Sequence, residues 1–423
     1  MNSFGSKIKL ILSDSTLRGR LLFVLGALVL FRLGTTIPVP GVNSEALARF
    51  FSGNQFLGLL NVFSGGGLSN LSIFMLGVGP FITGSIIMQL LTIMFPAIKR
   101  LYSEEGEAGR RKFTQYSRLL TVPLAIIQGY ALLALLENQG VLLHLSLGSK
   151  LINVVTIVAG SVLLMWIGEL ISEYGIGNGV SLIIFAGILA GIPSTVSQLA
   201  VNFEASQVPL YLVFLAVALI VTAGVVVVTE AERPIPVTYA KRVRGNKVYG
   251  GASTYLPLRL NQAGVMPIIF ALSVLLFPQM IAGFLTRVDI FWIKNLSGWV
   301  TAALNNAWFY GVAYFFLIFI FTYFYSAITF DPESVATNLQ KNGAFIPGIR
   351  PGRPTAEHVA FVLYRLTFVG AVFLALIAIL PLAMQSLTGL TSLAIGGTGL
   401  LIVVSVALEF MKQVGAQLSM REY

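Results

Sequence analysis

Long runs of hydrophobic residues, separated by shorter polar segments, dominate the chain. A helix needs about 20 mostly apolar residues to cross the hydrocarbon core of a bilayer, which is about 30 Å thick, because each residue advances it by about 1.5 Å. The runs that meet this requirement lie at 19–36, 71–95, 115–137, 151–171, 179–200, 208–229, 262–286, 304–328, 361–385 and 394–412. The pattern therefore predicts an all-α integral membrane protein with ten transmembrane helices.

Two stretches depart from this regular pattern. The fifth run is interrupted by Gly187, Gly191 and Pro193, which a span tolerates where protein or a water-filled cavity covers it. Ahead of the second run, residues 56–60 are apolar but too short to cross, and three glycines follow at 65–67. This segment is either a re-entrant half-helix with a glycine hinge or an ordinary external loop.

The composition agrees with a membrane protein and limits the chemistry. Hydrophobic residues make up 56% of the 423 and charged residues 10%, outside the range of soluble globular domains. The first apolar run has no small-residue cleavage site, so we interpret it as a span and not as a signal peptide. There is no cysteine, and the two histidines, His144 and His358, lie in predicted loops. We therefore expect no metal, no cofactor and no catalysis.

Basic residues predict the orientation of the spans. Nearly all of the 27 lysines and arginines lie in the termini and in the loops that join an even-numbered span to the next odd-numbered one. The opposite loops hold only Arg49, Lys150, Arg287 and Lys294. Since short cytoplasmic loops are enriched in Lys and Arg, both termini are predicted to be cytoplasmic.

The spans also suggest two halves. A division near residue 205 gives an N-terminal half at 1–205 and a C-terminal half at 206–423, each with five spans. An odd number of spans gives the halves opposite topology, which is the layout of inverted repeats with a pathway at their interface. Two basic loops, 230–260 and 329–360, are longer than a connection requires, so we expect them to be functional and to project into the cytoplasm.

Charged groups inside the spans are rare, which counts against an ion-coupled transporter. Glu169 and Glu173 lie at a cytoplasmic helix end and are expected to be solvated. Arg32, inside the first span, is better explained by a structural ion pair or an interhelical hydrogen bond than by a role in a pathway.

Polar and helix-breaking residues single out spans two and seven. Gly77, Gly79 and Pro80 are expected to weaken the second span near mid-membrane. Aliphatic pairs four residues apart share one helical face in spans two and five, which packing or lipid contact ordinarily explains. Buried polar side chains usually bond to neighbouring helices, so they either join helices structurally or belong to a gate. The candidates are Thr83, Gln89 and Asn261.

Six motifs, in order along the ten spans, resemble the SecY family, the bacterial protein-conducting channel subunits. They are Phe63-Ser64-Gly65-Gly66, Gly106 with Gly109-Arg110-Arg111-Lys112, Gly175-Ile176-Gly177-Asn178-Gly179, Asn261-Gln262-Ala263-Gly264-Val265-Met266-Pro267, Gly343-Ala344-Phe345-Ile346-Pro347-Gly348-Ile349-Arg350-Pro351-Gly352, and Gly396-Gly397-Thr398. The resemblance implies a clamshell of two inverted five-helix halves around an hourglass pore. Unfolded secretory proteins would cross through it, and membrane segments would leave sideways into lipid.

The resemblance also implies a constriction ring of branched aliphatic side chains. Such a ring is narrow and dry, so it disfavours water and ions while yielding to a passing chain. The family pattern has isoleucine at most of these positions, so the two valines imply a slightly wider or softer ring. By position, the ring consists of Val78, Ile82, Val180, Ile184, Ile269 and Ile402.

A plug and a lateral gate follow from the same resemblance. The plug would be a short half-helix near 57–67 that closes the external funnel and swings aside on its glycines. Spans two and seven would form the gate, with Thr83, Gln89 and Asn261 as candidate hydrogen-bonding residues across it. The predicted plug residues are Leu57, Leu60, Asn61, Phe63, Ser64, Gly65, Gly66 and Gly67.

The basic loops would then receive the machinery that delivers substrate, the ribosome or the SecA motor. The candidate docking residues are Arg242, Arg244, Lys247 and Arg350. Their charges suit phosphates and carboxylates, although simple topology determination also explains them. The family further implies SecE and SecG partner subunits, signal sequences and nascent chains as substrates, and the bacterial plasma membrane as location. An ion-coupled transporter with inverted repeats, and a channel or scaffold of unknown cargo, are the alternatives.

Overall fold

Helices form along the chain wherever the apolar runs predict them. The computed structural model describes residues 13–40, 61, 64–103, 105–138, 140–142, 146–201, 208–239, 242–244, 247–249, 253–285, 291–388 and 391–419. The helices of the N-terminal half are α2 (Ser15–Gly34), α5 (Gly79–Met94), α6 (Pro96–Ser103), α7 (Gly106–Asn138), α8 (Leu147–Tyr174) and α9 (Gly179–Val201). Those of the C-terminal half are α10 (Val208–Glu230), α11 (Met266–Leu285), α12 (Phe291–Asn305), α13 (Ala307–Thr329), α14 (Pro332–Lys341), α15 (Arg353–Thr388) and α16 (Thr391–Ser419).

Ten of these helices coincide with the predicted spans: α2, α5, α7, α8, α9, α10, α11, α13, α15 and α16. Within the described residues, six helices are individually long and apolar enough to cross a bilayer, and α5 with α6 passes the same test as a pair bent by 116°, which is either a broken span or a re-entrant loop. The apolar parts of α9 and α11 are shorter, Gly179–Pro193 and Met266–Gln279. The chain is thus a multi-pass membrane protein, and the predicted fold class is confirmed.

The second span begins later than predicted. Residues 73–78 form turns, and the helix starts only at Gly79, with Pro80 in its first turn. Proline suits this position because its missing N–H is one that the first helical turn leaves unpaired in any case. Gly79 and Pro80, which were expected to weaken the second span near mid-membrane, therefore lie at the start of its helix.

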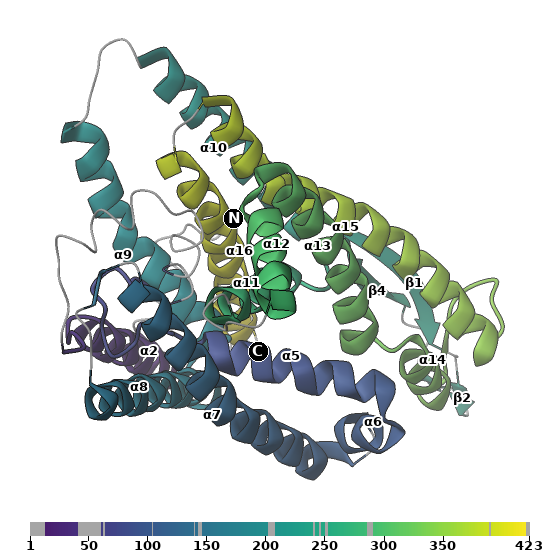
Figure 1. Ribbon diagram of the computed structural model, residues 1–423. Coiled ribbons are helices and arrows are strands. Elements are labelled where there is room, and N and C mark those ends of the chain that lie inside the picture. The colour runs from purple at the N-terminus through teal and green to yellow at the C-terminus, as the bar shows by residue number, and fades with distance from the viewer. Residues whose placement is uncertain are drawn as a thin grey trace.

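The two halves lie beside each other and share one apolar core (Figure 1). Helices α2, α7 and α8 gather on one side, while α10, α13 and α15 lie on the other. Contacts between the halves run through α9 with α16 and through α11 with α5 and α7. The short apolar helices α9 and α11 are thus placed centrally, where protein surrounds them.

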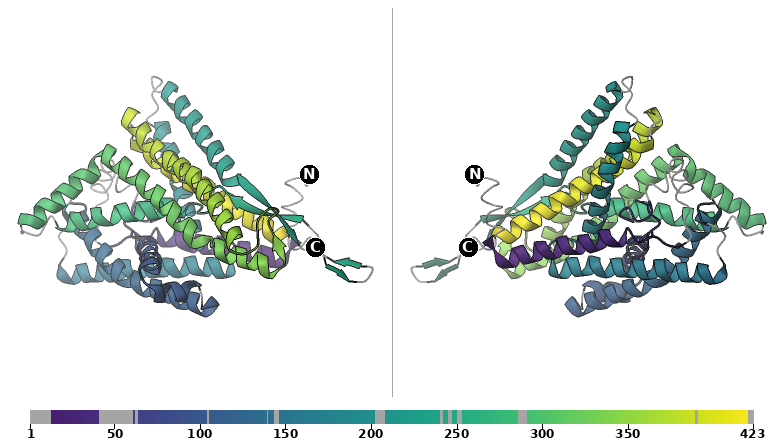
Figure 2. Two further views of the ribbon diagram at one scale, coloured as in Figure 1. Left: turned by 90° about the vertical axis from the view of Figure 1, so that its right-hand side faces the viewer. Right: turned by 90° about the vertical axis from the view of Figure 1, so that its left-hand side faces the viewer.

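The two long basic loops are folded and joined to each other. Strand β1 (Glu232–Tyr239) pairs antiparallel with β4 (Ser253–Arg259) and also with β5 (Ala344–Phe345) of the second loop. A small apolar core beneath this sheet includes Val237, Leu258 and Val359, the last from α15. The short strands β2 (Arg242–Arg244) and β3 (Lys247–Tyr249) form a hairpin that projects at one end of the molecule (Figure 2).

Candidate functional site

Branched aliphatic side chains from four helices are buried in the core of the molecule. Val78 directly precedes α5, whose first turn is closed by the Ile82 N–H donating to the Val78 carbonyl at 3.0 Å. Ile184 comes from α9, Ile269 from α11 and Ile402 from α16. These five residues are at most 4% exposed and belong to one continuous apolar cluster. The structure therefore brings the predicted ring residues into the same core, which we call the collar.

Val180 differs from the other predicted ring residues. It is only partly buried and packs against the edge of the same cluster. Its Cγ2 lies 3.2 Å from the position that a Cβ on Gly168 of α8 would occupy. This valine thus fills the crossing between α8 and α9, and its part in a ring stays a prediction.

The plug segment is compact where the structure describes it. Leu57, Leu60 and Phe63 lie outside the described residues, so the predicted half-helix stays untested there. From Ser64 onward the chain forms turns and not a helix. The buried Ser64 hydroxyl accepts from the Leu68 N–H at 2.9 Å and donates to the Asn61 carbonyl at 3.1 Å.

Backbone contact holds this segment against α9. A Cβ placed on Gly187 would lie 2.0 Å from the Cα of Gly65, so the two backbones touch with no room for a side chain. Gly65 itself has φ +62° and lies against the Phe31 ring of α2, which stacks on Phe74. Since Gly187 lies almost one helical turn beyond Ile184, the segment touches α9 one turn away from the collar.

Arg32 lies beside the same segment. Its Nη1 is 3.4 Å from the position that a Cβ on Gly66 would occupy, and the residue is otherwise exposed at the external end of α2. Gly66 and Gly67 complete the turns, Gly66 with φ +84°. The arginine is therefore placed next to the cover of the collar.

Thr83 and Gln89 lie on α5, which touches α11, whereas Asn261 lies in the segment just before α11. The Thr83 hydroxyl donates to the Gly79 carbonyl of its own helix at 3.0 Å, and the Asn261 amide donates to the Gly264 carbonyl at 3.1 Å. The Oε1 of Gln89 and the Oδ1 of Asn261 are buried and have no hydrogen-bond partner among the described residues. A direct bond across the two helices stays a prediction.

The basic docking candidates lie in the two long loops that carry the β-strands. Arg242, Arg244 and Lys247 belong to the β2–β3 hairpin, in which Arg244 and Lys247 are partners in the ladder. Arg350 is exposed and lies in a turn that ends at Gly352, whose φ is +96°. The Arg350 carbonyl accepts from the Thr355 hydroxyl at 2.8 Å, which ties this turn to the start of α15.

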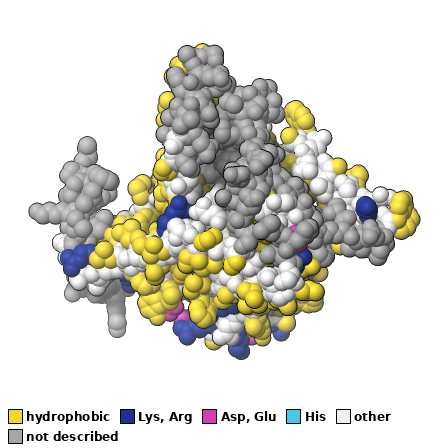
Figure 3. Space-filling view, turned by 60° about the vertical axis from the view of Figure 1, so that its left-hand side comes forward, with side chains coloured by type: hydrophobic (Ala, Val, Ile, Leu, Met, Phe, Trp, Pro, Cys, Tyr) yellow, Lys and Arg dark blue, Asp and Glu magenta, His cyan; other side chains and the backbone are white. Residues whose placement is uncertain are grey.

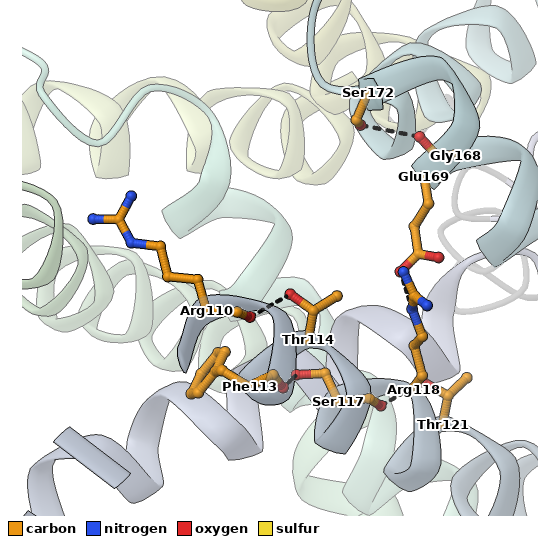
Figure 4. Close-up of polar contacts among 9 residues, drawn as sticks. All are labelled: Arg110, Phe113, Thr114, Ser117, Arg118, Thr121, Gly168, Glu169 and Ser172. Atoms are coloured by element: carbon orange, nitrogen blue, oxygen red, sulfur yellow. Dashed lines mark hydrogen bonds and ion pairs between the residues drawn. The ribbon is translucent and has the colours of Figure 1, made fainter. Parts of the chain in front are cut away.

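One interhelical ion pair was missed by the sequence analysis. The Nε of Arg118, on α7, lies 2.7 Å from the Oε1 of Glu169, on α8, and the two side chains point toward each other (Figure 4). Glu169 was expected to be solvated, but its side chain is only 19% exposed. The opposite charges at the cytoplasmic ends of two consecutive spans were the signal available in the sequence.

Comparisons with known proteins agree with this arrangement. The SecY family model matches residues 72–411. The protein translocase subunits SecY of Streptomyces galbus and of Synechocystis are each 44% identical, over 96% of this chain and 96% and 93% of theirs. A solved protein-conducting channel is 19% identical with a TM-score of 0.66, and the Sec61 of a canine ribosome–channel complex is 17% identical with a TM-score of 0.61. In both, the match covers 93% of this chain and 91% of the other.

Proposed function

The chain belongs to the SecY family, and we propose that it is the pore-forming subunit of a Sec translocon, with the collar as its constriction. The observation that carries this proposal is the burial of Val78, Ile82, Ile184, Ile269 and Ile402 in one apolar core to which both halves contribute. Five branched aliphatic side chains from four helices offer no charge or hydrogen-bonding group to a permeating ion. They stay dry when closed and can separate without breaking polar bonds.

The turns at 64–70 act as a removable cover on the external side of the collar. They touch α9 through the Gly65–Gly187 backbone contact, and this contact includes no interlocking side chain. An extended polypeptide that enters from the cytoplasm displaces the cover, which is held by packing and by few hydrogen bonds, such as the one that the Asn70 amide donates to the Thr35 carbonyl at 3.3 Å. The plug and the collar thus form two successive barriers to small solutes.

The lateral gate is the contact between α5 and α11. On α5 the Gln89 Oε1 is buried without a hydrogen-bond partner among the described residues, and such a group costs about 1–3 kcal/mol. Separation of the helices by an apolar segment would let this oxygen reach a donor. The unpaired oxygen therefore reduces the free energy needed to open the gate, which lets hydrophobic segments move into the bilayer.

We further propose the surroundings of this channel. It lies in the bacterial plasma membrane with both termini cytoplasmic, does no chemistry, and is driven by a SecA motor or by a translating ribosome that docks on the cytoplasmic sheet. The Sec61 relative in a ribosome complex and the basic hairpin at 242–249 support this docking. SecE and SecG subunits would complete the assembly.

Photo-crosslinking tests the pore directly. A photoreactive amino acid at Ile82 or Ile269 is expected to capture a secretory chain stalled in transit, because both side chains belong to the collar. The matched control is Leu219 on α10, which is 63% exposed on the outer surface and should capture lipid only. Capture from Leu219 but not from the collar positions would reject the pore assignment. Concentration of a small solute by reconstituted vesicles, with no crosslink to a translocating chain, would favour the transporter instead.

A further inference from the structure

Helix α12 carries three distinct stripes along its length. Ile293, Ser297, Val300 and Leu304 follow one another at helical spacing and face the protein, buried or half-buried. Lys294 and Asn305 share a second, polar face. The third stripe is apolar and fully exposed, and it consists of Trp292, Leu296 and Trp299. A helix that only joined two spans would not need an exposed apolar face.

The exposure of these aromatic rings is large. Trp292 is 81% exposed and Trp299 is 67% exposed, at the end of the molecule opposite to the β2–β3 hairpin (Figure 2). In the space-filling view hydrophobic side chains cover this projecting arm beside a basic side chain (Figure 3). Tryptophan is enriched where a protein surface meets the headgroup region, because its ring is apolar and its N–H is polar.

Helix α12 leads directly into a membrane-spanning helix. Helix α13 begins at Ala307 after Asn306, and its second residue, Trp308, is 81% exposed. Further along α13, Val312, Phe316 and Ile320 are also exposed on one face, as a span requires for contact with lipid. The exposed apolar side chains of α13 thus begin close to the end of α12.

We propose that α12 is an interfacial helix that lies in the external headgroup region of the bilayer, with Trp292, Leu296 and Trp299 directed toward the acyl chains. The part of its polar face that carries Lys294 then points to water, and its third face packs on the protein. Amphipathic helices of this kind insert their apolar side by about 5–10 Å. A lipid surface is favoured over a protein partner because α12 leads directly into α13, a span whose exposed apolar face contacts lipid.

This position has a consequence for α11. Helix α12 packs on α11, and the Gln279 amide of α11 donates to the Asn305 side chain of α12 at 3.4 Å. Anchoring of α12 in the interface therefore restrains the external end of α11 relative to the bilayer. An effect of this restraint on gating rests on the proposed function. The membrane contact of α12 itself does not depend on it.

Tryptophan fluorescence tests the contact. The chain has four tryptophans, so substitution of Trp166, Trp292 and Trp308 by Phe leaves Trp299 as the single reporter. This variant is reconstituted in phosphatidylcholine vesicles whose acyl chains are brominated either near the headgroup or near the chain end. Shallow bromines are expected to quench Trp299 about twofold more than deep bromines. A variant that retains only Trp166, an exposed residue of the α8 span, provides the deeper reference.

Two charge variants in the same background make the test specific. Leu296→Glu lies on the exposed stripe and is expected to abolish most of the quenching, while Lys294→Glu lies on the polar face and should leave it unchanged. Unquenched, red-shifted emission would show a water-exposed helix and overturn the proposal. Unquenched, blue-shifted emission would show that protein covers the stripe, which overturns it as well. Because no translocation is measured, failure here is separate from failure of the pore assignment.

Discussion

At the scale of single residues, the closest approach around the collar depends on glycine. Gly187 and Gly65 bring α9 and the plug segment into backbone contact, and any side chain at Gly187 would overlap the Gly65 Cα. Gly191 lies four residues further along α9 on the same helical face, yet nothing lies within 4 Å of the position of its Cβ. Substitution of Gly187 and, separately, of Gly191 therefore distinguishes the effect of replacing a helical glycine from the effect of disturbing this contact.

Gly187→Ala is expected to raise the ion conductance of the resting channel severalfold, because the added methyl group displaces the plug segment from the collar. Alanine is favoured over glycine in a helix by about 1 kcal/mol, so loss of folding is not the expected cause. Conductance of purified channels in planar bilayers measures the effect. Gly191→Ala should stay at the conductance of the unsubstituted protein. Equal conductance of both variants would show that the Gly65–Gly187 contact does not seal the pore.

At the scale of elements, the ion pair between Arg118 and Glu169 holds α7 and α8 together near the cytoplasmic side. The 2.7 Å contact is partly shielded, since the Glu169 side chain is 19% exposed and that of Arg118 43% exposed. Half-buried pairs contribute more than fully exposed ones but still only about 1 kcal/mol. They specify which helix faces meet more than they stabilise the fold.

A charge reversal across this pair measures its contribution. Arg118→Glu and Glu169→Arg should each lower the midpoint of thermal unfolding in detergent, because each places two like charges in contact. The double variant is expected to recover most of the loss, with a coupling free energy of roughly 0.5–1 kcal/mol. If the two losses simply add, the pair contributes no specific interaction.

The elements also show how far the sequence could predict the fold. The spans were predictable because a bilayer requires long apolar helices. Helix α12 was not predicted, since Lys294 and Asn295 interrupt a run too short to cross. The β1–β4 pairing was hidden by Pro234, Pro236 and Pro257, which are unusual in strands.

The candidate site, like the fold, was only partly predictable from the sequence. Spacing alone left Val78 and Ile82 as ordinary packing residues, and only the family resemblance selected them as part of a ring. The Gly65–Gly187 contact joins segments far apart in sequence, and no local pattern at Gly187 signals it. What the sequence could not supply was therefore tertiary proximity, both at the collar and between β1 and β5.

At the scale of the whole molecule, the two long basic loops are folded together. Strand β5 of the second loop pairs with β1 of the first, and α15 supplies Val359 to their common core. Force or charge applied to one loop is therefore transmitted to the other and to α15, which spans the membrane. Arg350 lies exposed in the turn that connects β5 to α15.

Arg350→Glu is expected to lower motor-driven export about tenfold or more while leaving the abundance and membrane insertion of the channel unchanged. The reason is that a charge-assisted contact with the proposed motor, once buried, contributes at least about 1.5 kcal/mol to docking. Export of a secretory protein into inverted vesicles, with channel abundance measured in the same membranes, gives both quantities. Lys341→Glu, an equally exposed reversal at the end of α14, is the control and should export normally. Reduced abundance of the Arg350 variant would instead assign the side chain a role in folding, because the variant retains the main-chain carbonyl that accepts from Thr355. Equal loss in both variants would point to net charge and not to a positioned guanidinium.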